Sequence, residues 1–99
     1  MKLNELLKNV KPLDIIGPTD IEIVGLDIDS RQIQSGFLFI AIRGTQADGH
    51  QYIDKAIAQG ALAVLCETLP EQRQEGVTYV TVQSTEDSVG AVATAFYGS

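Results

Sequence analysis

The sequence has few of the residues from which reactive sites are built. Its 99 residues include one cysteine, Cys66, one histidine, His50, and no tryptophan. A single cysteine cannot form a disulfide within the chain, which fits a reducing compartment. His50 has no second histidine or cysteine at metal-ligand spacing, so the sequence predicts no metal site. We expect His50 to be an exposed first-turn residue and Cys66 to be a buried, inert thiol.

Basic residues and long apolar runs are also scarce. Seven basic residues stand against thirteen acidic ones, which gives a net charge of -6, and no basic stripe occurs. This balance disfavours a nucleic-acid partner. No stretch approaches the ~18 apolar residues of a membrane span, and charges interrupt the first ten residues where a signal peptide would be apolar. We therefore expect no membrane partner and a cytoplasmic location.

Catalytic motifs are missing as well. The sequence contains no GxxxxGK[ST] loop, and it shows no Ser/His/Asp or Cys/His arrangement in which one residue could activate another. Several acidic residues are scattered in predicted loops and termini, where we expect solvated surface and not an acid/base pair: Glu67, Glu71, Glu75, Glu86 and Asp87. The chain alone is therefore expected to have no catalytic residue.

What the sequence does contain is the composition of a folded domain, with 44% hydrophobic and 20% charged residues. Its first half predicts a helix that Pro12 ends, a strand up to about Ile28 and a second strand over residues 37–42. The helix is indicated by apolar residues on one stripe, namely Leu3, Leu6, Leu7 and Val10. The first strand alternates, with a bulge or bend expected at Gly25. The second strand is almost wholly apolar, which is typical of burial on both faces.

The second half predicts a helix, two strands and a final helix. Residues 48–59 have helical spacing before Gly60, a typical C-terminal cap. Residues 61–67 and 77–82 are apolar runs that indicate strands. Ser84 and Asp87 form a capping box ahead of the last helix. This order predicts an α/β fold, with a small mostly parallel or mixed sheet flanked by helices.

Two polar segments follow the first two predicted strands. Asp29-Ser30-Arg31 leaves one strand, and residues 44–50 leave the next and lead into a helix. Ligands of such sheets gather at the carboxyl ends of strands, and a helix start offers unpaired N–H groups to an anion. The sequence therefore indicates a nucleotide or phosphate site.

A simpler interpretation of the same segments stays open. Asp48 can simply cap the helix, while Ser30 and Arg31 can simply close a turn. Tyr52 and Phe96 fall on helical core stripes, so we expect packing from them and not a base-stacking platform.

The order of the motifs resembles one family. DSR is followed by SG-F-LF-A, then by G-x-x-x-DGH-x-YI-x-x-A, then by GA-x-AVL-x-E, and finally by AFYG. This series, from about Ile21 to Gly98, resembles the N-terminal domain of the Mur ligases of peptidoglycan synthesis. Within that family it is most similar to the branch that adds the third peptide residue to UDP-N-acetylmuramoyl-L-alanyl-D-glutamate.

The resemblance implies a function and a set of site residues. Residues 1–99 would be a single UDP-binding domain, cut from a longer three-domain ligase, since the family continues past FYG into a proline-containing linker. The UDP-N-acetylmuramoyl-dipeptide would be its substrate, and the central ATPase domain and the C-terminal domain would be its partners in the same chain. ATP and Mg²⁺ would bind outside this domain, which itself would need no cofactor. The family's nucleotide contacts fall on five positions: Ile28, Ser30, Thr45, Gln46 and Ala47.

The resemblance also suggests roles for these residues. Ser30 would donate to the nucleotide, Thr45 and Gln46 would make polar contacts, and Ile28 and Ala47 would be apolar walls. Arg31 could pair with Asp29 or Asp48 to hold the loops instead of binding phosphate. Two other functions stay open: the N-terminal domain of the ligase that adds D-alanyl-D-alanine, and a free-standing nucleotide-sensing module.

Overall fold

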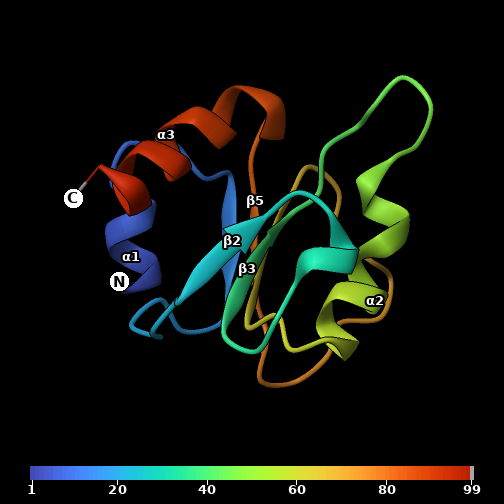
Figure 1. Ribbon diagram of the computed structural model, residues 1–99, viewed down its shortest axis with the longest axis horizontal. Coiled ribbons are helices and arrows are strands. Elements are labelled where there is room, and N and C mark those ends of the chain that lie inside the picture. Colours follow the sequence, from blue (N-terminus) through green and yellow to red (C-terminus); the bar gives the residue numbers. More distant parts are fainter. Residues whose placement is uncertain (99) are drawn as a thin grey trace.

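The computed structural model describes residues 1–98, and in it a five-stranded sheet lies between two layers of helix (Figure 1). The strand order is β1-β5-β4-β3-β2. Strands β2 to β5 run parallel, whereas β1 pairs antiparallel with β5. The strands are β1 (Asp14–Ile16), β2 (Gly25–Asp27), β3 (Phe37–Ile40), β4 (Ala63–Cys66) and β5 (Thr78–Thr81). The predicted α/β fold with a mixed sheet is confirmed.

Helices cover both faces of the sheet. α1 (Leu3–Leu6) and α3 (Thr85–Tyr97) lie together on one face, and α2 (Ile53–Ala58) lies on the other (Figure 1). Two short 3₁₀ turns complete the α2 side: η1 (Ser30–Gln32) after β2, and η2 (Gly49–Tyr52) directly before α2. None of the helices formed by residues 1–98 has the length and apolar character needed to cross a membrane.

The alternation of side chains along the central strands explains why two helical layers are needed. Leu38 and Ile40 of β3 point into the core under α1 and α3, whereas Phe39 points into the core under α2. β4 divides in the same way, with Leu65 on the first side and Val64 on the second. Because both faces of these strands are apolar, each face must be covered to be removed from water.

Two details of the N-terminal half differ from the sequence prediction. β1 was not predicted, because three residues at a sheet edge carry too little alternation to stand out from a loop. Gly25, where a bulge or bend was expected within a longer strand, is the first residue of β2. A Cβ atom at Gly25 would lie 2.5 Å from the ring of Phe37, so a larger residue at this position would displace that ring.

The first predicted helix is shorter than expected. Its backbone hydrogen bonds change to three-residue spacing after Leu6, with Lys8 N–H donating to Glu5 O and Val10 N–H donating to Leu7 O. The apolar stripe is nevertheless buried as predicted, since Leu7 and Val10 join the core under α1 and α3. The apolar spacing therefore identified the buried face correctly but overestimated the length of the helix.

Candidate functional site

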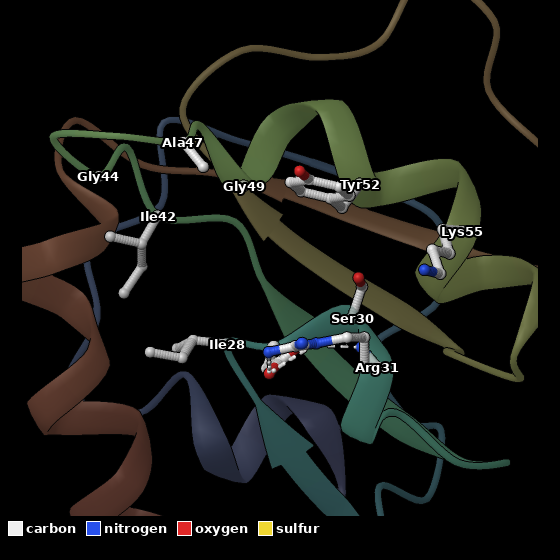
Figure 2. Close-up of a pocket in the computed structure, with 10 residues that line it drawn as sticks. Ile28, Ser30, Arg31, Ile42, Gly44, Ala47, Gly49, Tyr52 and Lys55 are labelled. Atoms are coloured by element: carbon white, nitrogen blue, oxygen red, sulfur yellow. Dashed lines mark hydrogen bonds and ion pairs between the residues drawn. The ribbon is translucent and has the colours of Figure 1, made fainter.

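The carboxyl ends of β2 and β3 open onto a depression of about 580 Å³ between η1 and the segment that leads into α2 (Figure 2). A cavity of this size is within the usual range for small-molecule sites, about 300–1,000 Å³. The depression combines apolar, aromatic and charged side chains with two glycines. Its lining residues are Ile28, Asp29, Ser30, Arg31, Ile42, Gly44, Ala47, Gly49, Tyr52 and Lys55.

The structure brings three of the five predicted contact residues to this depression. Ile28, Ser30 and Ala47 line it, from two different loops. Thr45 and Gln46 form the exposed turn between Gly44 and Ala47 and are not among the lining residues. The two polar segments singled out in the sequence therefore meet in space, and the role of the five residues in binding stays a prediction.

Ser30 has the position of a ligand-facing donor. The residue is 6% exposed, and its hydroxyl oxygen points into the depression toward Tyr52 and Lys55 (Figure 2). Its Oγ makes no hydrogen bond within residues 1–98. The carbonyl of Ser30 accepts a hydrogen bond from Gln59 Nε2, which also donates to Ile33 O at 3.3 Å. The end of α2 therefore holds η1 in place while leaving the serine hydroxyl available.

Asp29 and Arg31 form a local pair at the rim of the depression. Asp29 Oδ1 accepts from the backbone N–H of Arg31 at 2.9 Å, and Arg31 Nη2 donates to Asp29 Oδ2 at 2.8 Å. These bonds lower the pKa of Asp29 from 3.8 to about 2, the side-chain bond from Arg31 having the largest effect and the backbone bond the next. Of the two pairings considered for Arg31, the structure contains the one with Asp29.

The start of the α2 segment corrects two expectations. The first turn is the 3₁₀ turn η2, and its N–H groups are not unpaired as the sequence argument assumed. Gly49 N–H donates to Ile42 O, and His50 N–H donates to Asp48 Oδ1 at 3.0 Å. Asp48 does cap this turn, and an acidic cap makes the terminus less attractive to an anion than a bare helix start. Any anion in the depression must therefore be held mainly by other groups.

His50 is not the exposed residue that the sequence predicted. Its side chain is 14% exposed, because the ring lies between the Asp48 carboxylate and the end of β4. The residues around Asp48-Gly49 could not reveal this burial, because the partner of His50, the backbone of Glu67 after β4, is far away in the sequence. His50 therefore lies between the loop that contains Asp48 and the end of β4, and not at the surface.

Lys55 and Tyr52 were missed as candidate site residues. Tyr52 was predicted to pack in the core, but it is 40% exposed and lines the depression. Lys55 points into the same space, and no ion pair among the described residues engages its ammonium (Figure 2). A signal was available, because Tyr52 and Lys55 are three apart and therefore share one side of the helical segment, next to the buried stripe of Ile53 and Ala56.

Glu67 and Cys66, at the end of β4, lie just behind the site. Glu67 was expected to be solvated surface, but its Oε2 accepts from Thr85 N–H at 2.9 Å and from Thr85 Oγ1 at 3.2 Å. Glu67 Oε1 lies 3.5 Å from Arg43 Nε.

Cys66 is fully buried as predicted, and burial, followed by the charge of Glu67, raises the pKa of its thiol to about 11. The thiol is therefore protonated and unreactive at neutral pH.

The chemistry of the depression is that of binding. It presents a hydroxyl, an ammonium, a guanidinium already paired with Asp29, an aromatic ring and apolar walls. One carboxylate against two cations leaves a small positive balance in a chain that is acidic overall. Within residues 1–98, no group of three or more His, Cys, Asp or Glu is placed to hold a metal ion. Such a site can hold a small anion that also carries an apolar or aromatic part.

Comparison with known proteins gives consistent matches. Residues 22–97 match the family described as Mur ligase family, catalytic domain. The UDP-N-acetylmuramoyl-L-alanyl-D-glutamate–2,6-diaminopimelate ligases of Bacteroides fragilis and Bacteroides thetaiotaomicron are 57% and 54% identical to the chain over 99 residues. Each match covers 100% of this chain and 20% of the relative. The chain therefore spans about a fifth of the length of the curated relatives it matches.

Solved structures agree on the fold. A crystal structure of MurF from Acinetobacter baumannii superposes with a TM-score of 0.80 and 21% identity, covering 95% of this chain and 20% of that one. MurF ligase from Thermotoga maritima in complex with ADP gives a TM-score of 0.62 and 27% identity, over 74% of this chain and 16% of that one.

Proposed function

The chain belongs to the Mur ligase family as an N-terminal domain, and we propose that it holds the uridine diphosphate end of UDP-N-acetylmuramoyl-L-alanyl-D-glutamate during addition of the third peptide residue. The observation that carries this proposal is the convergence of Ser30 Oγ and Lys55 on one depression at the strand ends, with neither group engaged by another of the described side chains. A diphosphate needs donors and a cation, and both are present there.

The lining of the depression supports a nucleotide over a bare phosphate. Tyr52 offers a ring face and Ile28 offers an apolar wall, which suit the planar base of a uridine. The backbone N–H groups of Thr45, Gln46 and Ala47 make no hydrogen bond within the described residues, so they remain available to the ligand. In this proposal Thr45 and Gln46 contribute through the backbone of their turn, whereas Ser30, Ile28 and Ala47 contribute from the wall.

The work of this domain would be positioning. The peptide carboxyl that reacts is at the opposite end of the substrate from the uridine diphosphate, so the residues of the depression bind a remote part and hold the reacting end where other domains can act on it. Binding energy from such a remote part is used for orientation and not for bond-making. We propose that the 99 residues have no catalytic group of their own.

We propose that ATP and Mg²⁺ bind outside this domain. The sequence has no GxxxxGK[ST] loop, and none of the described residues forms a cluster suited to a metal ion. In the proposed full-length enzyme, an ATP-dependent ligase of peptidoglycan synthesis, both would bind to the central domain of the same chain. The third residue would be 2,6-diaminopimelate, as in the names of the relatives that are 57% and 54% identical.

The proposal is tested by titrating the 99-residue chain with UDP and following backbone amide shifts by NMR. We expect the largest shifts at Ser30, at residues 45–47 and at Tyr52. Ser30→Ala removes one hydrogen bond, so the Kd for UDP should rise about two- to tenfold. Lys55→Ala should weaken the binding of UDP more than the binding of uridine, because only UDP carries phosphate charges that the Lys55 ammonium can attract.

A matched control is Lys11→Ala, which removes an exposed lysine outside the depression and should leave the Kd unchanged. Shifts confined to residues outside both the depression and the turn formed by residues 45–47 would contradict the site. An activity assay of the full-length enzyme with diaminopimelate or with D-alanyl-D-alanine distinguishes the two ligase functions. Use of D-alanyl-D-alanine would contradict the branch proposed here.

A further inference from the structure

The loop that forms one wall of the depression has little apolar anchoring of its own. Residues 43–47 are all exposed, and the loop closes on itself through the hydrogen bond from Gly44 N–H to Ala47 O at 2.9 Å. At its end, Gly49 N–H donates to Ile42 O at 2.8 Å. Because burial does not hold this loop, its position relative to the depression depends on polar contacts.

His50 joins this loop to the sheet through both of its ring nitrogens. Its Nδ1 lies 2.7 Å from Asp48 Oδ1, and its Nε2 lies 2.9 Å from the backbone nitrogen of Glu67. A backbone N–H can only donate, so Nε2 must be the acceptor and the ring proton must be on Nδ1. That proton points at Asp48, which makes the Nδ1–H tautomer the one that satisfies both neighbours.

Asp48 transmits this contact to the loop. Its Oδ1 accepts from the backbone and the ring of His50, and these two bonds, the backbone one first, lower the pKa of Asp48. Its Oδ2 lies 3.9 Å from Arg43 Nε at the other end of the loop. The carboxylate therefore stays charged and links both ends of residues 43–48.

The other side of His50 is fixed to the centre of the fold. Glu67 directly follows β4, whose four residues are all buried. Its carboxylate accepts from Thr85 at the first residue of α3 and lies 3.5 Å from Arg43 Nε. The backbone N–H that His50 accepts therefore belongs to a segment held by both the sheet and a helix.

We infer that His50 is a positioning residue for the nucleotide site: through its Nδ1–H tautomer it ties Asp48, and with it the loop 43–48, to the end of β4. It has no contact with the depression itself, since Ala47 and Gly49 line the cavity and His50 does not. This inference rests on the proposed function, because the position of the loop matters only if a ligand uses it. The role of His50 in positioning the loop and the binding of UDP can each fail without the other.

Two variants divide the contacts of His50. His50→Ala removes both, whereas His50→Gln retains an acceptor near the Nε2 position and so preserves the bond from Glu67 N–H. Gln51→Ala is the matched control, because Gln51 is the exposed neighbour on the same turn and its side chain makes no hydrogen bond among the described residues.

We expect His50→Ala to speed hydrogen exchange at the amides of Gly44 and Gly49 about tenfold and to raise the Kd for UDP about tenfold. Exchange in β3 should stay close to that of the unaltered chain. His50→Gln should recover only part of both effects, because it keeps the acceptor for Glu67 N–H but lacks the Nδ1–H donor to Asp48. Gln51→Ala should show neither effect. In the unaltered chain, ¹⁵N correlation spectra of the ring should find Nδ1 protonated and Nε2 unprotonated.

The inference is overturned if His50→Ala retains normal UDP affinity and loop exchange, or if the ring has its proton on Nε2. It is also overturned if exchange accelerates equally in the loop and in β3, because the residue would then stabilise the whole fold. If the unaltered chain does not bind UDP, the proposed function fails, and the exchange rates of Gly44 and Gly49 alone decide the role of His50.

Discussion

Asp29-Ser30-Arg31 after β2 and Asp48-Gly49-His50 before α2 form nearly the same turn. The two aspartates have almost equal backbone angles, φ -104° and ψ 116° for Asp29 and φ -100° and ψ 119° for Asp48. Each Oδ1 accepts from the N–H two residues later, at 2.9 and 3.0 Å. In each triplet the third side chain returns to the same carboxylate.

The two turns differ in what lies beyond the third residue. The Arg31 side chain is 76% exposed and its pair ends at the surface, whereas the His50 side chain is 14% exposed and continues to the backbone of Glu67. Local sequence therefore determines the turn, because an aspartate reaches its own backbone two residues on in either place. Only the surrounding packing decides whether the turn is free at the surface or fixed to the core.

The largest difference in stability between the two turns is expected from substitutions at the middle residue of each triplet. A Cβ atom at Gly49 would lie 2.7 Å from the backbone nitrogen of Ile42, which cannot move without disturbing β3. We expect Gly49→Ala to lower the free energy of unfolding by about 2 kcal/mol. Ser30→Ala should lower it by about 0.5 kcal/mol or less. Urea unfolding followed by circular dichroism measures both.

The control for this substitution is Gly90→Ala. Gly90 lies inside α3 with open space around it, so the added methyl group should raise the free energy of unfolding by about 0.5–1 kcal/mol. If Gly49→Ala raised the free energy of unfolding as Gly90→Ala does, the close approach of Gly49 to Ile42 would not matter for stability.

A smaller difference is expected at the first residue. Asp48→Ala removes the cap of η2 and the partner of His50, and should lower the free energy of unfolding by about 1–2 kcal/mol. Asp29→Ala should lower the free energy of unfolding by less than Asp48→Ala does, because Arg31, the partner of Asp29, is largely in water. Thermal unfolding compares the two, with Glu71→Ala as an exposed control. Equal losses would show that the buried contacts of His50 add nothing.

The smallest expected effect is the pH response of the exposed pair. The pKa of Asp29 is lowered from 3.8 to about 2, so its contribution to stability is present above pH 3.8 and is lost as the pH falls through about 2. Arg31→Gln should return the pKa of Asp29 toward 3.8, which ¹³C NMR of the carboxyl carbon measures. A pKa that stays near 2 in Arg31→Gln would assign the shift to the backbone bond alone.

Much of the fold could be predicted from the sequence. The apolar runs of β3, β4 and β5 and the spacing of α3 identify buried elements by composition and periodicity alone, and all four are present. β1 could not be predicted, because an edge strand of three residues is specified by its pairing with β5 and not by its own pattern.

The candidate site was predicted less completely. Of the five contact residues that the resemblance implied, Ile28, Ser30 and Ala47 line the depression, whereas Thr45 and Gln46 do not. Tyr52 and Lys55 were missed because one helical turn can direct neighbouring residues either to the core or to a cavity. Glu67 was misjudged for a similar reason, since its partners Arg43 and Thr85 come from other elements. Contacts between residues far apart in sequence leave no local signal.

The sequence by itself determined the buried faces, the α/β order and the two aspartate-capped turns, because each depends on residues within a few positions of one another. Only the tertiary structure decided that these turns face one depression, that Lys55 points into it, and that His50 joins Asp48 to the end of β4. The physical reason is that parallel pairing brings the ends of β2, β3 and β4 to one edge of the sheet, where side chains from distant segments meet.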